Sequence, residues 1–243
     1  MTQTLLTLFP DPKDLLALEP EDLGGVILEI APGVTQNGMF NLNSLTAQLF
    51  QVVGTPYPHG MQRPVINAIA EALSQLVSFG LLFQDPDQPA TWYRPTRRAQ
   101  ALKTRTDVEK FRRGRILPIE LLQPAFAEKV WPLFLRGDHD VAVFQAFKEV
   151  EVATRNAANA KGAGYPDDLL GIALMRRAFH PDTGPLTNSS AVAAEREAEM
   201  HLFSGAIGHA KNPVSHRAVN LPPQEAARLV VFASHLLSIV EQR

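Results

Sequence analysis

The spacing of hydrophobic residues predicts helices along most of the chain. Residues 11–30 show a helical pattern that Pro20 breaks into two pieces and that stops at Pro32. Two further helices are expected over residues 41–53 and 64–79, because apolar residues recur there every three or four positions. The apolar stripe of the second of these helices is formed by Ile66, Ala70, Leu73 and Val77.

A short hairpin is predicted after the helix at 64–79. Residues 81–84 are typical of an apolar strand, residues 85–89 contain turn-forming Asp and Pro, and residues 91–94 are typical of a return strand. A helix that leads into a polar hairpin closed by Trp92 and Tyr93 resembles a winged helix, over roughly residues 40–103. The resemblance implies a DNA- or RNA-binding domain, although winged helices serve protein contacts as often.

The second half of the chain has almost no strand signals. Helices are expected at residues 124–136, 138–160, 167–179, 190–211 and 222–242. Their short connections favour antiparallel neighbours in a helical bundle. The sequence therefore predicts a mainly α protein. Its parts are an N-terminal helical segment (1–39), a winged-helix-like domain (40–103), a basic linker (104–118) and a helical domain (119–243).

Composition is that of a water-exposed globular protein, with 243 residues, 45% of them hydrophobic and 20% charged. A chain of this length can form one or two domains with a sizeable core. No apolar run approaches the roughly 18 residues that span a bilayer. The N-terminal residues lack the cationic segment of a secretory signal. With no cysteine to form disulfides, a cytoplasmic protein is expected.

Positive charge is concentrated in residues 94–115, where nine Lys or Arg accompany two acids. The net charge of this basic stripe is +7 and that of the remaining chain is −9. The stripe is a candidate contact for a polyanion, or else a solvated face of a helix and linker. The candidate nucleic-acid-binding residues are Arg63, Arg94, Arg97, Arg98, Lys103 and Arg105.

The densest chemical signal lies at residues 211–217, Lys-Asn-Pro-Val-Ser-His-Arg. An imidazole moves protons near neutral pH, cations stabilise a phosphorane-like transition state, and an amide or hydroxyl orients the scissile group. These groups suffice to cleave a phosphodiester without a metal. The alternative is structural, because Lys in a last helical turn followed by Asn and Pro is an ordinary helix end.

Other enzymatic signatures are absent from the sequence. His201 and His209 are eight residues apart, a spacing that does not place them on one helix face. No His-Glu-x-x-His pattern, phosphate-binding glycine loop or Gly-x-Ser-x-Gly elbow occurs. No metal site and no cofactor are expected, so an enzymatic function would use metal-free chemistry.

Two helices of the C-terminal half carry features that can be tested. The core stripe of the helix at 138–160 is formed by Val143, Phe147, Val150 and Thr154. Glu151 borders this stripe, and it either forms a surface ion pair with Arg155 or orients a cation or the imidazole near Lys211 and His216. In the helix at 190–211, Gly205 and Gly208 weaken the helix unless a close approach requires small residues.

Three sequence blocks identify a family resemblance. GDHDVAVFQAFKEVEVATR, DLLGIALMRRAFHPDTGPLT and EAEMHLFSGAIGHAKNPVSHR, in this order, resemble the Ymh-type family of bacterial proteins, which belongs to the HEPN superfamily of helical domains. The resemblance covers about residues 119–242. Many HEPN domains are metal-independent endoribonucleases of toxin–antitoxin, phage-defence and RNA-processing systems. Their signature is an Arg, usually a polar residue after it, and a His four to six residues further on.

The resemblance implies roles for the residues that match this signature. His216 would be the general acid or base, Lys211 would stabilise transition-state charge, and Asn212 would orient the imidazole or the phosphate. Glu151, Arg155, Ser215 and Arg217 would support them. Lys211 replaces the Arg of the signature and loses its planar fork, which puts activity rather than fold in question.

The implied substrate is single-stranded or looped RNA, because the 2′-hydroxyl attacks the adjacent phosphorus. The implied assembly is a homodimer with two motifs facing one groove. The alternative function is a non-catalytic nucleic-acid-binding or regulatory protein, whose winged-helix-like domain binds DNA and whose helical domain dimerises. In that case Lys211 is a helix-end cation and His216 a structural histidine.

Overall fold

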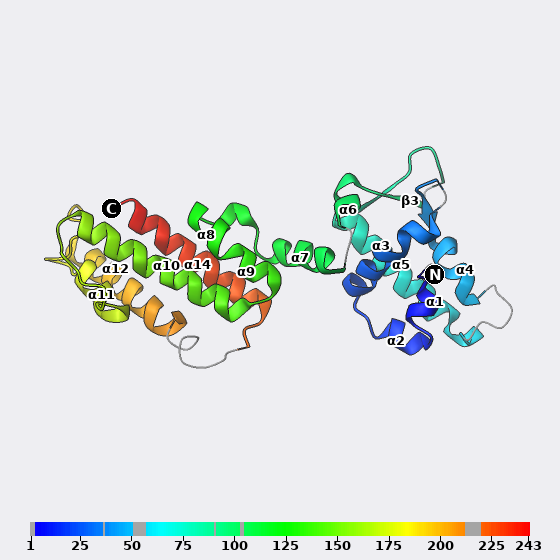
Figure 1. The fold of residues 1–243 in the computed structure, drawn as a ribbon, viewed down its shortest axis with the longest axis horizontal. Coiled ribbons are helices and arrows are strands. Elements are labelled where there is room, and N and C mark those ends of the chain that lie inside the picture. The colour runs from blue at the N-terminus through cyan, green and yellow to red at the C-terminus, as the bar shows by residue number, and fades with distance from the viewer. Residues whose placement is uncertain (1–2, 36, 51–56, 90, 103–104, 212–219) are drawn as a thin grey trace. The chain divides into compact units, whose positions relative to one another are not determined.

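The structure is a computed structural model. It describes residues 3–35, 37–50, 57–89, 91–102, 105–211 and 220–243. Contacts between residues divide the chain into two compact units, unit 1 (Met1–Glu109) and unit 2 (Lys110–Arg243). Both units are mainly helical (Figure 1), as the sequence predicts. Within the described ranges, no helix combines the length and the apolar character that crossing a membrane requires.

Unit 1 consists of helices with a small sheet (Figure 1). Its helices are α1 (Leu5–Leu8), α2 (Pro12–Leu16), α3 (Pro20–Val34), α4 (Leu42–Phe50), η1 (His59–Met61), α5 (Gln62–Ser78) and α6 (Arg97–Ala101). Its strands are β1 (Phe40–Asn41), β2 (Leu82–Gln84) and β3 (Trp92–Pro95). The two halves of the predicted hairpin are therefore present as β2 and β3.

The sheet of unit 1 is antiparallel, with the order β1-β3-β2. Phe40 of β1 pairs with Tyr93 of β3, and Leu82 of β2 pairs with Pro95. The first strand thus comes from the segment between α3 and α4, and it closes the sheet against the hairpin that follows α5. Along the chain the order is helix, strand, two helices and then a two-stranded hairpin.

The buried face of α5 differs from the predicted apolar stripe. Val65, Ile69, Ala72, Leu73 and Leu76 are buried, whereas Val77 is 39% exposed. The prediction was wrong because α5 is apolar over more than one face, and packing against α3 selects the face one position away. The two helices approach closely, since a Cβ added at Gly24 would lie 3.2 Å from Leu76 Cδ2.

The prolines of α3 act as predicted at one end only. Pro20 stands at the first helical position, where its missing N–H breaks no bond. Pro32 lies inside the helix, which ends at Val34, so the predicted stop at Pro32 was wrong. Pro32 removes only the bond to the carbonyl of Leu28, and near a helix end this loss leaves the remaining turn in place.

Two polar contacts fix the loops of unit 1. The Tyr57 hydroxyl donates to the Phe9 carbonyl at 2.6 Å, and burial together with the nearby charges of Asp11 and Asp14 raises the pKa of Tyr57 to about 12. Asp85 forms an ion pair with Arg94. Hydrogen bonds from the Arg94 side chain and the Asp87 N–H lower the pKa of Asp85.

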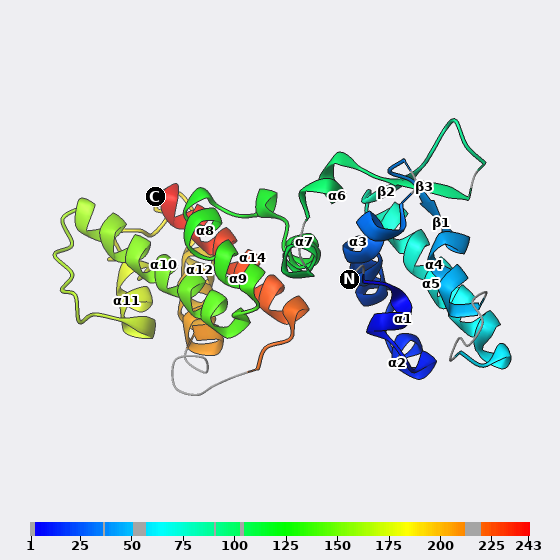
Figure 2. The same cartoon turned by 45° about the vertical axis from the view of Figure 1, so that its right-hand side comes forward.

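Unit 2 is a helical bundle (Figures 1 and 2). Its elements are the end of α7 (Arg105–Ile116), η2 (Ile119–Leu121), α8 (Pro124–Lys129), α9 (Trp131–Arg136), α10 (His139–Ala160), α11 (Gly171–Ala178), α12 (Ala193–Ala206), the π-helical turn η3 (Ile207–Lys211) and α14 (Pro223–Glu241). The predicted helix 124–136 is two helices, because Pro132 lacks the N–H that would continue α8.

The core of unit 2 lies between α10 and α14, which run side by side in both views (Figures 1 and 2). Phe147 of α10 and Phe232 of α14 make an edge-to-face contact with centroids 6.3 Å apart. Phe179 stacks on Phe203 of α12 at 3.9 Å. The predicted stripe of α10 (Val143, Phe147, Val150 and Thr154) is fully buried. This part of the core prediction is confirmed.

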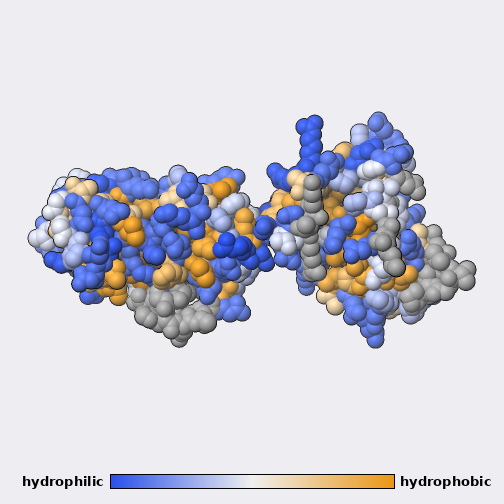
Figure 3. Space-filling model, viewed as in Figure 1, coloured by the Kyte–Doolittle hydropathy of each residue, from blue (hydrophilic) through white to orange (hydrophobic). Residues whose placement is uncertain are grey.

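The C-terminal part of α7 is anchored in unit 2. Arg113 donates to the Leu135 carbonyl at 2.8 Å, and the Trp131 indole donates to the Leu117 carbonyl at 3.0 Å. The segment predicted as a basic linker is therefore mostly a helix. The surfaces visible in Figure 3 mix hydrophilic and hydrophobic residues in both units.

Two of the glycines in the helix predicted at 190–211 have different surroundings. A Cβ added at Gly208 would lie 3.0 Å from Ile172 Cδ1, so a close approach of α11 requires a small residue there. A Cβ at Gly205 would meet nothing within 4 Å. The close-approach explanation thus holds for Gly208 alone.

Candidate functional site

Glu151 is the buried acid of unit 2. It follows Val150 of the α10 core stripe and is 2% exposed. The local sequence explains this position, because one residue beyond a core position turns the side chain by only about 100° and keeps it at the edge of the core. Such a carboxylate is costly to bury unless donors surround it.

Lys211 provides the first donor. It is the last residue of η3, and its ammonium forms an ion pair with Glu151 Oε2. The Lys211 side chain is 15% exposed, and Nζ lies 5.7 Å from the ring centroid of Phe144. Of the two alternatives for Glu151, the structure has the one in which the carboxylate faces Lys211.

Gly171 provides the second donor. Its backbone N–H donates to Glu151 Oε1 at 2.6 Å. Gly171 starts α11 with a φ of +60°, a left-handed conformation that glycine adopts without a Cβ penalty. Glu151 therefore joins three helices, since it stands on α10 and accepts from the first residue of α11 and the last residue of η3.

The Glu151–Lys211 pair fixes geometry more than it adds stability. Desolvation of two charges offsets most of their attraction, so a buried ion pair contributes little net free energy. Charge-assisted hydrogen bonds nevertheless have narrow geometry. The consequence is a defined position for Lys211 at the point where the chain enters residues 212–217.

Arg155 does not pair with Glu151. Its Nη2 donates to the Leu169 carbonyl at 2.8 Å, and its buried Nε has no hydrogen-bond partner among the described residues. Arg155 therefore fixes the segment before α11, which carries Gly171. Asn159 acts on the same segment by accepting from the Tyr165 N–H at 2.6 Å.

The remaining residues of the predicted site lie outside the described residues. These are Asn212, Ser215, His216 and Arg217. The described chain stops at Lys211 and resumes at Asn220. The structure thus positions the cation of the motif together with its acidic partner.

The cations predicted to bind nucleic acid in unit 1 differ in their surroundings. Arg94 is engaged by Asp85 and donates to the Asn37 carbonyl at 3.1 Å. Arg63 is exposed in the first turn of α5, and Arg97 and Arg98 are exposed on α6. Lys103 and the Arg105 side chain lie outside the described residues.

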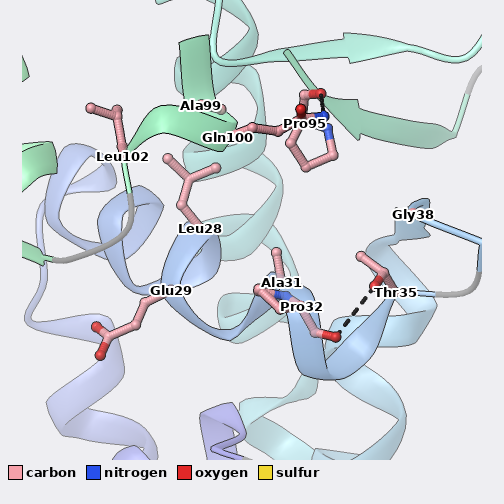
Figure 4. Close-up of a pocket in the computed structure, with 10 residues that line it drawn as sticks. All are labelled: Leu28, Glu29, Ala31, Pro32, Thr35, Gly38, Pro95, Ala99, Gln100 and Leu102. Carbon is pink, nitrogen blue, oxygen red and sulfur yellow. Dashed lines mark hydrogen bonds between the residues drawn. The ribbon is translucent and has the colours of Figure 1, made fainter. Parts of the chain in front are cut away.

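Unit 1 also contains a pocket of about 440 Å³ between the end of α3 and α6 (Figure 4). Its polar groups are engaged locally. Thr35 Oγ1 donates to the Pro32 carbonyl, and Gln100 Nε2 donates to the Pro95 carbonyl, both at 3.4 Å. Glu29 points away from the other residues in Figure 4. This pocket offers little polar recognition for a ligand.

No group of three or more His, Asp or Glu within the described ranges is arranged to hold a metal ion. The acid of unit 2 that is buried instead accepts from Lys211 and Gly171. A carboxylate with both oxygens engaged by protein donors is poorly suited to bind a cation.

Residues 120–240 match the model of a family described as "Protein of unknown function (Hypoth_ymh)". The match supports the Ymh-type family. This Ymh-type region contains Glu151, Gly171, Lys211 and α14, and the family description assigns it no activity. No curated protein and no solved structure matches the chain.

Sequence reasoning missed two contributors to this site. Gly171 lies 20 residues beyond Glu151, and only the packing of α11 brings its N–H to the carboxylate. Phe144 lies on α10 one turn before Phe147, and its ring faces Lys211. The helical spacing places Phe144 next to the core stripe, but no local signal identifies its partner.

Proposed function

We propose that the protein is a metal-independent endoribonuclease of HEPN type, active in phage defence or as part of a toxin–antitoxin system. RNA is the substrate, and a 2′-hydroxyl attacks the adjacent phosphorus. His216 removes or delivers the proton, Lys211 stabilises the phosphorane charge, and Asn212 orients the imidazole or the phosphate. The products carry a 2′,3′-cyclic phosphate and a 5′-hydroxyl. Ser215 and Arg217 support the phosphate, and two copies form a homodimer.

The observation that carries this proposal is the buried Glu151–Lys211 pair. A lysine that merely ends a helix needs only the last carbonyls of that helix, worth about 0.3–1 kcal/mol. Here a buried carboxylate and a glycine N–H from a third helix hold its ammonium one residue before Asn212. Such preorganisation is what a charge aimed at a transition state requires.

Glu151 has a positioning role in this proposal. Its negative charge reduces the net charge that Lys211 presents, but its second oxygen fixes the direction of the ammonium through Gly171. The Lys side chain remains 15% exposed, so a phosphate can approach it from the open side. Arg155 acts one step further away by holding the segment before Gly171.

Substitution of Lys211 tests the proposal. Lys211→Ala is expected to lower the cleavage rate about 100-fold or more, the cost of losing a preorganised donor. Lys211→Arg keeps the charge and is expected to retain activity. Rates and melting temperatures are measured together in chelator. Equal rates for wild type and Lys211→Ala would contradict the proposal and leave Lys211 as a helix-end cation.

A second candidate function is a non-catalytic nucleic-acid-binding or regulatory protein. The order of elements in unit 1, with α4 and α5 between β1 and the β2–β3 hairpin, supports a winged-helix-like DNA-binding domain. The exposed side of α5 has one cation, Arg63, and one acid, Glu71, so phosphate contacts would come mainly from Arg97 and Arg98. Arg97→Ala with Arg98→Ala is expected to weaken duplex binding in this case, with a smaller salt slope of about 0.9 per lost phosphate contact.

A further inference from the structure

A groove of about 500 Å³ runs along the outer face of α14 in unit 2. Its apolar floor includes Val231, Phe232 and Ile116, the last residue of α7. Phe232 is supported from below by its edge contact with Phe147. The volume lies within the range of about 300–1,000 Å³ that is typical of small-molecule sites.

The polar rim of this α14 groove consists of donors. Gln224, Arg228 and His235 line it, and no Asp or Glu does. With Val231 they follow helical spacing, so they share one stripe of α14. All three are exposed, and their side chains have no hydrogen-bond partner within the part of the chain that the structure describes. These donors are therefore available to a ligand.

The charge around the groove is also positive. Residues 110–116 of α7, which end at Ile116, contain four Lys or Arg and no acid. Glu225 is the acid in the first turn of α14, and it does not line the groove. A ligand with negative charge and hydrogen-bond acceptors is complementary to this environment.

The α14 groove begins close to the predicted catalytic motif along the chain. Gln224 follows His216 by eight residues, and α14 is the first described helix after the motif. A polymer bound at the motif would reach this face of α14 within a few nucleotides.

We propose that the α14 groove binds one nucleotide of single-stranded RNA next to the cleavage site. The base lies against the apolar floor formed by Val231 and Phe232, and Arg228 and His235 bind phosphate oxygens. Gln224 donates to a base edge. This inference rests on the proposed ribonuclease function and names a subsite of the same substrate. An apolar helix from a second copy would leave the rim donors without acceptors, so RNA fits the groove better.

The test measures binding of a 2′-O-methyl single-stranded oligonucleotide to the full-length chain. This probe cannot be cleaved, because its 2′-oxygen carries no proton. Arg228→Ala combined with His235→Ala is expected to weaken binding at least tenfold and to reduce the salt slope by about 0.7 for each lost phosphate contact. The matched control is Arg176→Ala, an exposed arginine of α11, which lies at the opposite end of unit 2 from α7 in both views (Figures 1 and 2). It is expected to bind like wild type.

The outcomes separate this inference from the proposed function. Unchanged binding by the double variant, with its helix content intact, would overturn the groove as an RNA site. Unchanged binding together with a change of oligomeric state by sedimentation would assign the groove to a contact between copies, and would overturn it too. Equal losses in the Arg176→Ala control would also count against it. Selective loss of binding in a protein that cuts no RNA would support the groove and contradict the nuclease.

Discussion

Glu151→Gln removes one charge from the buried pair and keeps its shape. The amide oxygen can still accept from the Gly171 N–H, but the amide cannot neutralise Lys211. Breaking a buried pair by removing one partner costs about 3–5 kcal/mol. Because the Lys211 side chain is 15% exposed and its ammonium regains some water, we expect a loss of about 2–3 kcal/mol in the free energy of unfolding. Glu151→Ala also leaves the Gly171 N–H unsatisfied and costs about 1–3 kcal/mol more.

Urea unfolding of unit 2 measures these losses. The chain contains two tryptophans, so Trp92→Phe leaves Trp131 of unit 2 as the single tryptophan reporter. Lys211→Met combined with Glu151→Leu removes both charges and is expected to recover much of the stability, as replacement of whole buried pairs often does. A loss below about 0.5 kcal/mol for Glu151→Gln would refute the reasoning, because that is the range of an exposed pair.

Three further predictions concern other contacts. Arg94→Ala removes the main cause of the low pKa of Asp85. A lowered folded-state pKa stabilises the native state above the unfolded value of about 3.9 and is lost as pH falls through the folded-state value, so the variant is expected to be less stable at pH 7 but equal to wild type in strong acid. Tyr57→Phe is expected to cost about 0.5–1.5 kcal/mol; in wild type, the tyrosine with a pKa of about 12 makes the protein lose stability as pH rises from about 10 through 12, and spectrophotometric titration should show the late tyrosine disappear in the variant. Gly184→Ala is expected to destabilise by about 1–3 kcal/mol or more, because the new Cβ would lie 2.4 Å from a backbone nitrogen, whereas Gly205→Ala, with open space around it, is expected to stabilise α12 by about 0.5–1 kcal/mol; thermal melts of both variants decide this pair.

Helix spacing predicted the elements of unit 2 because its helices have a single apolar face. In α10 the buried stripe and the place of Glu151 beside it both follow from a period of 3.6 residues. In α5 the same reasoning selected the wrong stripe. Two adjacent faces of α5 are apolar, and only the tertiary contact with α3 determines which one is buried.

The candidate site could be predicted only in part for a related reason. The types and spacing of Lys211 and His216 are visible in the sequence, and so is the proximity of Glu151 to the core. The contact of Glu151 with Gly171 depends on the packing of α11, and the choice between Arg155 and Lys211 as its partner depends on which side of α10 faces η3. Local patterns carry no information on either.

Cleavage of single-stranded RNA in excess EDTA by the wild type and by His216→Ala tests the central proposal most directly. The account predicts that the wild type cuts and leaves 2′,3′-cyclic phosphate and 5′-hydroxyl ends. His216→Ala should lose about 100- to 10,000-fold in rate, the range of general acid–base catalysis, while its melting temperature stays the same. No cleavage by the wild type, or a loss below tenfold in His216→Ala, would contradict it.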